Sequence, residues 1–209
     1  HWVSNGVFSL TPAHTFSNKI FDNMYFSSYS TANQCLLVQL SLVPSCPPEL
    51  IRSIDNHVST NILELLATNP FVTYDYQQQV YVLHPLYRNF LSKKKYLLTK
   101  EEIRSTIDDA AQWFYQHGYY SEAGTLYVEA DDLEGLLNTL FTVGPLNYSF
   151  SESRDTLDYL SGLPWEKTSS MPLVELAMAI MQLNEMHVNQ ARNLLKSLLA
   201  RLGIIEEPD

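Results

Sequence analysis

The hydrophobic period of the chain changes within its first half. Apolar residues at helical spacing predict short helices, and the period then becomes two in residues 71–74 and 80–84, which are rich in β-branched and aromatic side chains. The polar residues 75–79 separate these runs, so one β-hairpin is expected. Caps and prolines mark the expected helix starts: Ser30 or Thr31 before 35–43, Pro48 within 47–54, Ser59 or Thr60 before 61–69, and Pro85 after the hairpin.

The sequence pattern of the second half predicts helices throughout. Thr99 and Glu102 have the spacing of a capping box for a helix expected to end near His117, where Gly118 can adopt the left-handed conformation. Further helices are expected over residues 121–130, 132–143, 152–163, 172–187 and 188–202, with Asp131 or Asp132 and Ser151 as caps. The predicted fold class is mainly α: a winged helix with one β-hairpin, followed by antiparallel helical hairpins in a TPR-like array.

Charge divides the chain near Lys100. Residues 1–100 hold seven Lys and Arg against five Asp and Glu, whereas residues 101–209 hold six against eighteen, and the whole chain has a net charge of −10. This asymmetry predicts a domain boundary, with a winged-helix domain over 15–98 and a helical domain over 99–209. The chain has no initiator Met, so we expect it to be a segment of a longer protein.

The sequence offers little that points to catalysis. It contains no GxxxxGK[ST], GxGxxG, GxSxG or HExxH motif, and its six histidines have no His or Cys partner at ligand spacing. We therefore expect neither an enzyme nor a metal site. Cys35 and Cys46 form no CxxC pair, which favours a reduced, cytoplasmic setting, and no apolar run reaches the ~18 residues that span a bilayer.

The winged-helix outline raises the question of DNA binding. The expected recognition helix, residues 59–68, has no Lys or Arg and carries Glu64, whereas readers of the major groove present cations and amides to bases and phosphates. The basic run at 93–95 is interpreted as the solvated end of a helix. With the acidic balance of the whole chain, this favours a winged helix that packs against protein.

Three motifs occur in the order known from one family. Residues 71–94 resemble the end of the winged helix in MalT-like regulators of the LuxR family, which are STAND-class ATPases. The family pattern is an apolar hairpin, then His-Pro-Leu-Phe and a helix; the corresponding residues are His84, Pro85, Leu86 and Tyr87. The later motif residues are Trp113, Gly118, Glu122 and Ala123, followed by Leu163, Pro164, Trp165 and Pro172. The resemblance covers about residues 15–200.

The resemblance implies a position within a larger regulator. Family members carry an ATP- or ADP-binding domain, then a winged helix, a helical arm with TPR-like sensor repeats, and a C-terminal helix-turn-helix that binds DNA. Residues 1–14 are then expected to be a remnant of the nucleotide-binding domain, and that domain of the same chain is the expected partner. A small-molecule or protein effector is implied for the repeats, DNA only for the missing helix-turn-helix, and no membrane.

His84 is the one residue to which the resemblance assigns nucleotide contact. In related STAND proteins a histidine after the hairpin contacts the ADP phosphate and holds the resting state, and His84 resembles it in position. The sequence departs from that motif because Pro85 stands where Asp is common. The alternative is that His84 bonds a nearby backbone group and sets the start of the next helix.

These patterns lead to one preferred function and two alternatives. The preferred one is a non-catalytic regulatory segment that couples nucleotide state and effector sensing to activation of a MalT-like, LuxR-family regulator. The first alternative is a stand-alone helical scaffold that binds another protein or a peptide. The second is a DNA-binding winged-helix regulator, which the uncharged recognition helix disfavours.

Overall fold

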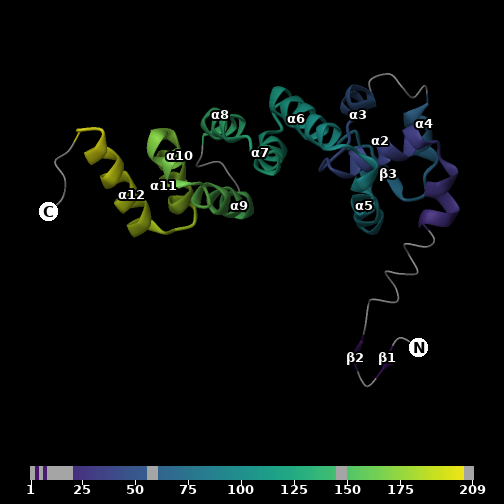
Figure 1. The fold of residues 1–209 in the computed structure, drawn as a ribbon, viewed down its shortest axis with the longest axis horizontal. Coiled ribbons are helices and arrows are strands. Elements are labelled where there is room, and N and C mark those ends of the chain that lie inside the picture. The colour runs from purple at the N-terminus through teal and green to yellow at the C-terminus, as the bar shows by residue number, and fades with distance from the viewer. Residues whose placement is uncertain (1–2, 5–6, 9–20, 56–60, 145–149, 205–209) are drawn as a thin grey trace. The chain divides into compact units, whose positions relative to one another are not determined.

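The computed structural model describes residues 3–4, 7–8, 21–55, 61–144 and 150–204 (Figure 1). The chain divides into two compact units, His1–Ala110 (unit 1) and Ala111–Asp209 (unit 2). The predicted mainly helical fold with a small antiparallel hairpin is confirmed. The helix α6, Lys100–Gln116, crosses from one unit into the other.

Unit 1 contains short helices around a buried helix. Two single turns, Phe21–Tyr25 and Phe26–Ser28, precede the longer helices, which are α2 (Thr31–Ser41), α3 (Pro48–Asp55), α4 (Ile62–Thr68) and α5 (Pro85–Ser92). The Ser30 hydroxyl accepts from the Asn33 amide at 3.3 Å, so Ser30 is the expected cap. The helix α2 packs against α3 and α5 (Figure 1). Its residues Leu37, Val38 and Leu40 are fully buried.

The hairpin lies where the change of period predicted it. Strand β3 (Val72–Asp75) pairs antiparallel with β4 (Val80–Leu83), and Gln79 closes the turn with a φ of +57°. On its other edge, β4 meets the segment between α2 and α3, because Cys46 and Tyr81 exchange backbone hydrogen bonds. The order of elements is therefore helix, bridged segment, two helices and hairpin.

Unit 2 consists of helices joined by short turns. They are α7 (Tyr120–Glu129), α8 (Leu133–Val143), α9 (Phe150–Ser161), α10 (Trp165–Ser170), α11 (Pro172–Asn184) and α12 (Val188–Arg201). Neighbours in sequence pack as pairs, α7 with α8 and α11 with α12, while α11 also packs against α9. The buried cluster between α8, α9 and α11 includes Leu136, Leu140, Leu160 and Met181.

Several helix ends confirm the sequence signals. The Thr99 amide and hydroxyl donate to Glu102 Oε2 at 2.7 and 2.9 Å, and the Glu102 amide donates back to the Thr99 hydroxyl, which is the predicted capping box. Gly118 has a φ of +79°, as a helix stop requires. Asp132 caps α8 by accepting from the Gly135 amide at 3.0 Å.

Other local predictions were wrong in detail. The cap of α4 is Asn61, without a side-chain bond, whereas the expected caps at residues 59–60 lie outside the described part of the chain. Ser151 lies inside α9, which begins at Phe150. The short helix α10 was not expected: Pro164 is its N-cap, where the missing N–H of a proline breaks no hydrogen bond within the helix. A small pair, β1 (Val3–Ser4) with β2 (Val7–Phe8), was also not expected.

Candidate functional site

His84 is the N-cap of α5. Its Nδ1 accepts a hydrogen bond from the Leu86 amide at 3.3 Å, and the residue is exposed. This bond is possible only while Nδ1 carries no proton, so a neutral ring that makes it has its proton on Nε2. His84 therefore sets the helix start and still has a donor, Nε2–H, that the cap does not use.

The residues after His84 divide between surface and core. Pro85 is exposed at the first position of α5, and Leu86 is 40% exposed. Tyr87 is fully buried, and its hydroxyl accepts from the amide of Asn69 at 3.4 Å. Asn69 also accepts from the Phe71 amide at 2.9 Å, so one buried side chain ties the end of α4 to the hairpin and to α5. The hydroxyl that distinguishes Tyr87 from the family's Phe has a partner here.

Two of the cationic side chains of unit 1, Arg88 and Lys94, make contacts within the unit. Arg88 donates to the carbonyl of Pro44 at 2.9 Å. Lys94, in the middle of the basic run, lies 3.0 Å from Asp22 and over the rings of Phe26 and Phe90, at 4.8 and 5.0 Å from their centroids. The run at 93–95 thus presents two exposed cations to solvent, and α4 presents none.

The family-motif residues of unit 2 occupy separate turns. Trp113 stacks on His117 with ring centroids 3.9 Å apart, and His117 Nδ1 donates to the Trp113 carbonyl at 2.8 Å. Gly118 ends α6, and on α7 Glu122 is half-buried and Ala123 fully buried. Pro164 caps α10, of which Trp165 is the first residue. His84 belongs to unit 1 and these residues belong to unit 2, so neither unit contains the whole set of motif residues.

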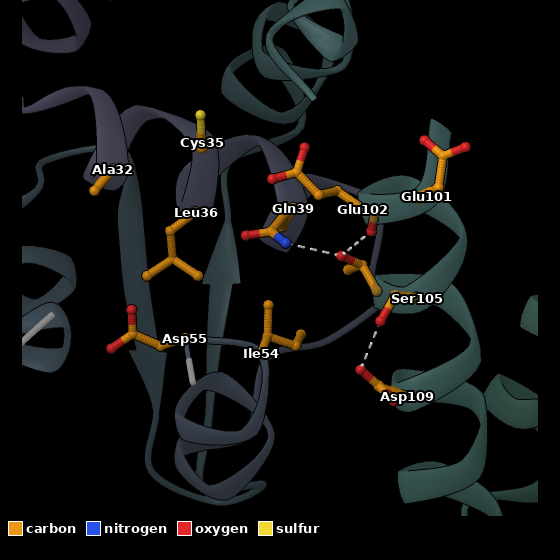
Figure 2. A pocket seen from close by; sticks show the side chains of 11 residues that line it. Ala32, Cys35, Leu36, Gln39, Ile54, Asp55, Glu101, Glu102, Ser105 and Asp109 are labelled. Carbon is orange, nitrogen blue, oxygen red and sulfur yellow. Dashed lines mark hydrogen bonds between the residues drawn. The ribbon is translucent and has the colours of Figure 1, made fainter. Parts of the chain in front are cut away.

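A cavity of about 440 Å³ lies within unit 1, between α2, α3 and the first turns of α6 (Figure 2). Leu36 from α2 and Ile54 from α3 point toward one another across it. The residues that line it are Ala32, Cys35, Leu36, Gln39, Ile54, Asp55, Glu101, Glu102, Ser105, Thr106 and Asp109. It therefore combines an apolar floor with a polar wall.

Hydrogen bonds order the α6 side of this cavity. Gln39 Nε2 donates to the Thr106 hydroxyl at 3.0 Å, and that hydroxyl donates to the Glu102 carbonyl at 2.7 Å (Figure 2). Ser105 donates to Asp109 at 3.2 Å. The Thr99 amide, and then its hydroxyl, lower the pKa of Glu102, so this carboxylate remains charged at neutral pH.

Sequence reasoning missed Asn69, Lys94 and the cavity. The position of Asn69 before Pro70 indicates only the end of a helix, and Lys94 is predicted only as one member of a solvated basic run. Asp109 stands beside Asp108 in the sequence, a pairing that predicts only a solvated face of the helix. It is exposed but lines the cavity, whereas Asp108 pairs with Arg104 at 3.6 Å. Glu102, Ser105 and Asp109 are three and then four residues apart, which places them on one side of α6. This spacing is the signal available in the sequence.

No protein-family model, curated protein or solved structure matches the chain. Within the described residues, no group of three or more His, Cys, Asp and Glu residues has an arrangement that could hold a metal ion. No helix in that part of the chain is both long and apolar enough to cross a membrane. The site is therefore judged from its own geometry.

Proposed function

We propose that this chain is a non-catalytic regulatory segment of a MalT-like, LuxR-family regulator that depends on ATP. Its first unit acts as a winged helix that docks on a nucleotide-binding domain of the same protein. Its second unit acts as a TPR-like helical region that receives an effector. The chain transmits a change of state between these neighbours and carries out no reaction itself.

The observation that carries this proposal is the backbone pairing of Cys46 with Tyr81. It places an extended segment between α2 and α3 on the edge of β4. The resulting order of helix, bridged segment, two helices and hairpin resembles that of a winged helix. Because the third helix of that order, α4, has no Lys or Arg, the geometry supports docking on protein more than binding in the major groove.

The exposed side of His84 supports a role at the docked face. Its Nε2–H is free of the cap and suits an acceptor such as a phosphate oxygen. In the proposed mechanism, ADP favours the state in which unit 1 is docked on the nucleotide-binding domain. The effector favours the open state, in which the two are apart. Each ligand shifts the equilibrium only by its difference in affinity for the two states.

Two substitutions at His84 separate a nucleotide contact from a capping role. His84→Ala removes both the cap and the ring, whereas His84→Asn keeps a side-chain acceptor for the Leu86 amide and removes the ring. If the ring holds the resting state, both variants in the intact regulator raise basal transcription and weaken ADP binding. If only the helix start matters, His84→Asn behaves as the parent protein does.

The parent reading frame provides the second test. The proposal expects a P-loop upstream of this segment and a helix-turn-helix downstream, in one open reading frame. A frame with neither would favour the stand-alone scaffold. Tight, salt-sensitive binding of duplex DNA by this chain in a gel-shift assay would favour the DNA-binding alternative and contradict docking as the role of unit 1.

A further inference from the structure

The cavity of unit 1 has the size and composition of a binding site. Its volume of about 440 Å³ falls within the ~300–1,000 Å³ typical of pockets that hold ligands. Leu36 from α2 and Ile54 from α3 supply apolar surface (Figure 2), and the hydrogen bond from Gln39 to Thr106 supplies a fixed polar contact. All the residues that line the cavity belong to unit 1.

The charge of the lining selects the class of ligand. Four of the nine Asp and Glu residues of unit 1 line the cavity, and none of the seven Lys and Arg residues that the structure describes in this unit does. The carboxylates come from two elements, Asp55 from α3 and Glu101, Glu102 and Asp109 from α6. A phosphate or carboxylate ligand would be repelled here, whereas a cation with an apolar portion would match both the rim and the floor.

We propose that this cavity binds the arginine side chain of a partner polypeptide. A guanidinium group carries five donors in a planar fork that matches carboxylates. Its three-carbon stem can lie along Leu36 and Ile54 while the charged end meets the rim. The described carboxylates form no group of three or more that could hold a metal ion. The inference does not depend on the regulatory function proposed above.

Binding is tested on the whole 209-residue chain by NMR, with acetyl-arginine methylamide as the probe. The expected result is saturable shifts of the amides of Cys35, Ser105 and Asp109, which weaken as salt is raised from 50 to 300 mM. The matched probe is acetyl-citrulline methylamide, which has nearly the same shape without the charge. It should bind at least about threefold more weakly, because it forms no ion pair.

Two neighbouring substitutions provide the protein control. Asp109→Asn removes a lining charge and is expected to weaken binding about threefold, while Asp108→Asn, next to it but outside the lining, leaves binding unchanged. Asp109 is exposed and Asp108 is half-exposed, and the amide spectrum of each variant reports its fold. Equal binding of the two probes, equal effects of the two variants, or shifts outside the cavity would overturn the proposal. Binding of spermidine to these residues without binding of the arginine probe would also overturn it, in favour of a polyamine site.

Discussion

Cys46 and Tyr81 are joined by two backbone hydrogen bonds, from Cys46 N to Tyr81 O at 3.2 Å and from Tyr81 N to Cys46 O at 2.9 Å. The pairing holds the segment between α2 and α3 against the hairpin, and it carries the Cys46 side chain into the core. The thiol is fully buried and lies 3.6 Å from the Leu40 carbonyl. Burial raises the pKa of Cys46 to about 12, which leaves almost no thiolate at neutral pH.

We expect the two cysteines to differ sharply in reactivity. Cys35 is half-buried at the cavity, and although burial and the charge of Glu102 raise its pKa, its sulfur remains accessible. At pH 8, N-ethylmaleimide should modify Cys35 at least about a hundredfold faster than Cys46, measured by mass spectrometry of peptides. In 6 M guanidinium chloride the two rates should become similar. Modification of Cys46 in the native Cys35→Ser variant at the rate of the unfolded chain would contradict the pairing described above.

The contrast between local and distant contacts explains what the sequence could predict. The cap at Ser30, the capping box of Thr99 and Glu102, and the stop at Gly118 were all predicted correctly. Each depends on residues within four positions of one another, so the pattern contains all the participants. The hairpin was predicted for the same reason, because its period and its turn are both local.

The remaining features depend on partners far apart in the chain. Asn69 stops a helix, which its position before Pro70 indicates, but its bonds to Tyr87 and Tyr29 follow only from the packed core. Likewise, Cys46 carries no signal that it pairs with β4. The cavity requires α2, α3 and α6 to meet, and hydrophobic periodicity shows which side of each helix is buried without showing what it packs against.

Tyr87 should make the stability of the protein depend on pH in the alkaline range. Burial raises its pKa from 10.0 to about 12, although the hydrogen bond from Asn69 lowers it. Between these values the unfolded chain loses the phenolic proton and the folded chain keeps it, so the free energy of unfolding falls as pH rises. Tyr87→Phe has no such proton, so its free energy of unfolding relative to that of the parent chain should rise by about 2 kcal/mol across this range.

The measurement is urea denaturation of the two proteins at half-unit steps from pH 8.5 to pH 11.5. At the lowest pH the Phe variant should be less stable by about 1 kcal/mol or less, because it loses one long hydrogen bond. The two stability curves should then converge and cross as pH rises. Curves that stay parallel throughout would mean that Tyr87 does not retain its proton in the folded state.

Lys94 should contribute to stability while its neighbours in the basic run do not. Its ammonium group is paired with Asp22 and lies over two rings, and its side chain is only 15% exposed. Lys94→Met keeps an apolar stem and removes the charge, and it should cost about 1–2 kcal/mol, measured by urea denaturation. Lys93→Met and Lys95→Met, at exposed positions, are matched controls expected to change stability by less than about 0.5 kcal/mol. Equal effects at all three positions would show that Lys94, like Lys93 and Lys95, is only a solvated residue at the end of a helix.

Gly135 on α8 lies close to Tyr127 on α7 in unit 2. A Cβ at this position would lie 2.5 Å from two ring carbons of Tyr127 and 2.7 Å from Asp132 Oδ2, on the side chain that caps α8. Tyr127 packs against the buried cluster of this unit, so its ring has little room to move. Gly135→Ala should therefore destabilise the protein by about 1–3 kcal/mol, even though alanine favours a helix over glycine by about 1 kcal/mol.

Gly162, at the end of α9, provides the comparison for this glycine. A Cβ there would meet only the Asp158 and Tyr159 carbonyls at 3.4 and 3.5 Å, which is ordinary contact. Gly162→Ala should thus change the melting temperature little, whereas Gly135→Ala should lower it by several degrees, both followed by circular dichroism at 222 nm. Measuring Gly135→Ala in both the parent chain and a Tyr127→Ala background separates the clash from a loss of helix capping, because only the clash needs the ring. If Gly135→Ala costs as much without the ring as with it, the Asp132 cap and not the helix contact is what Gly135 protects.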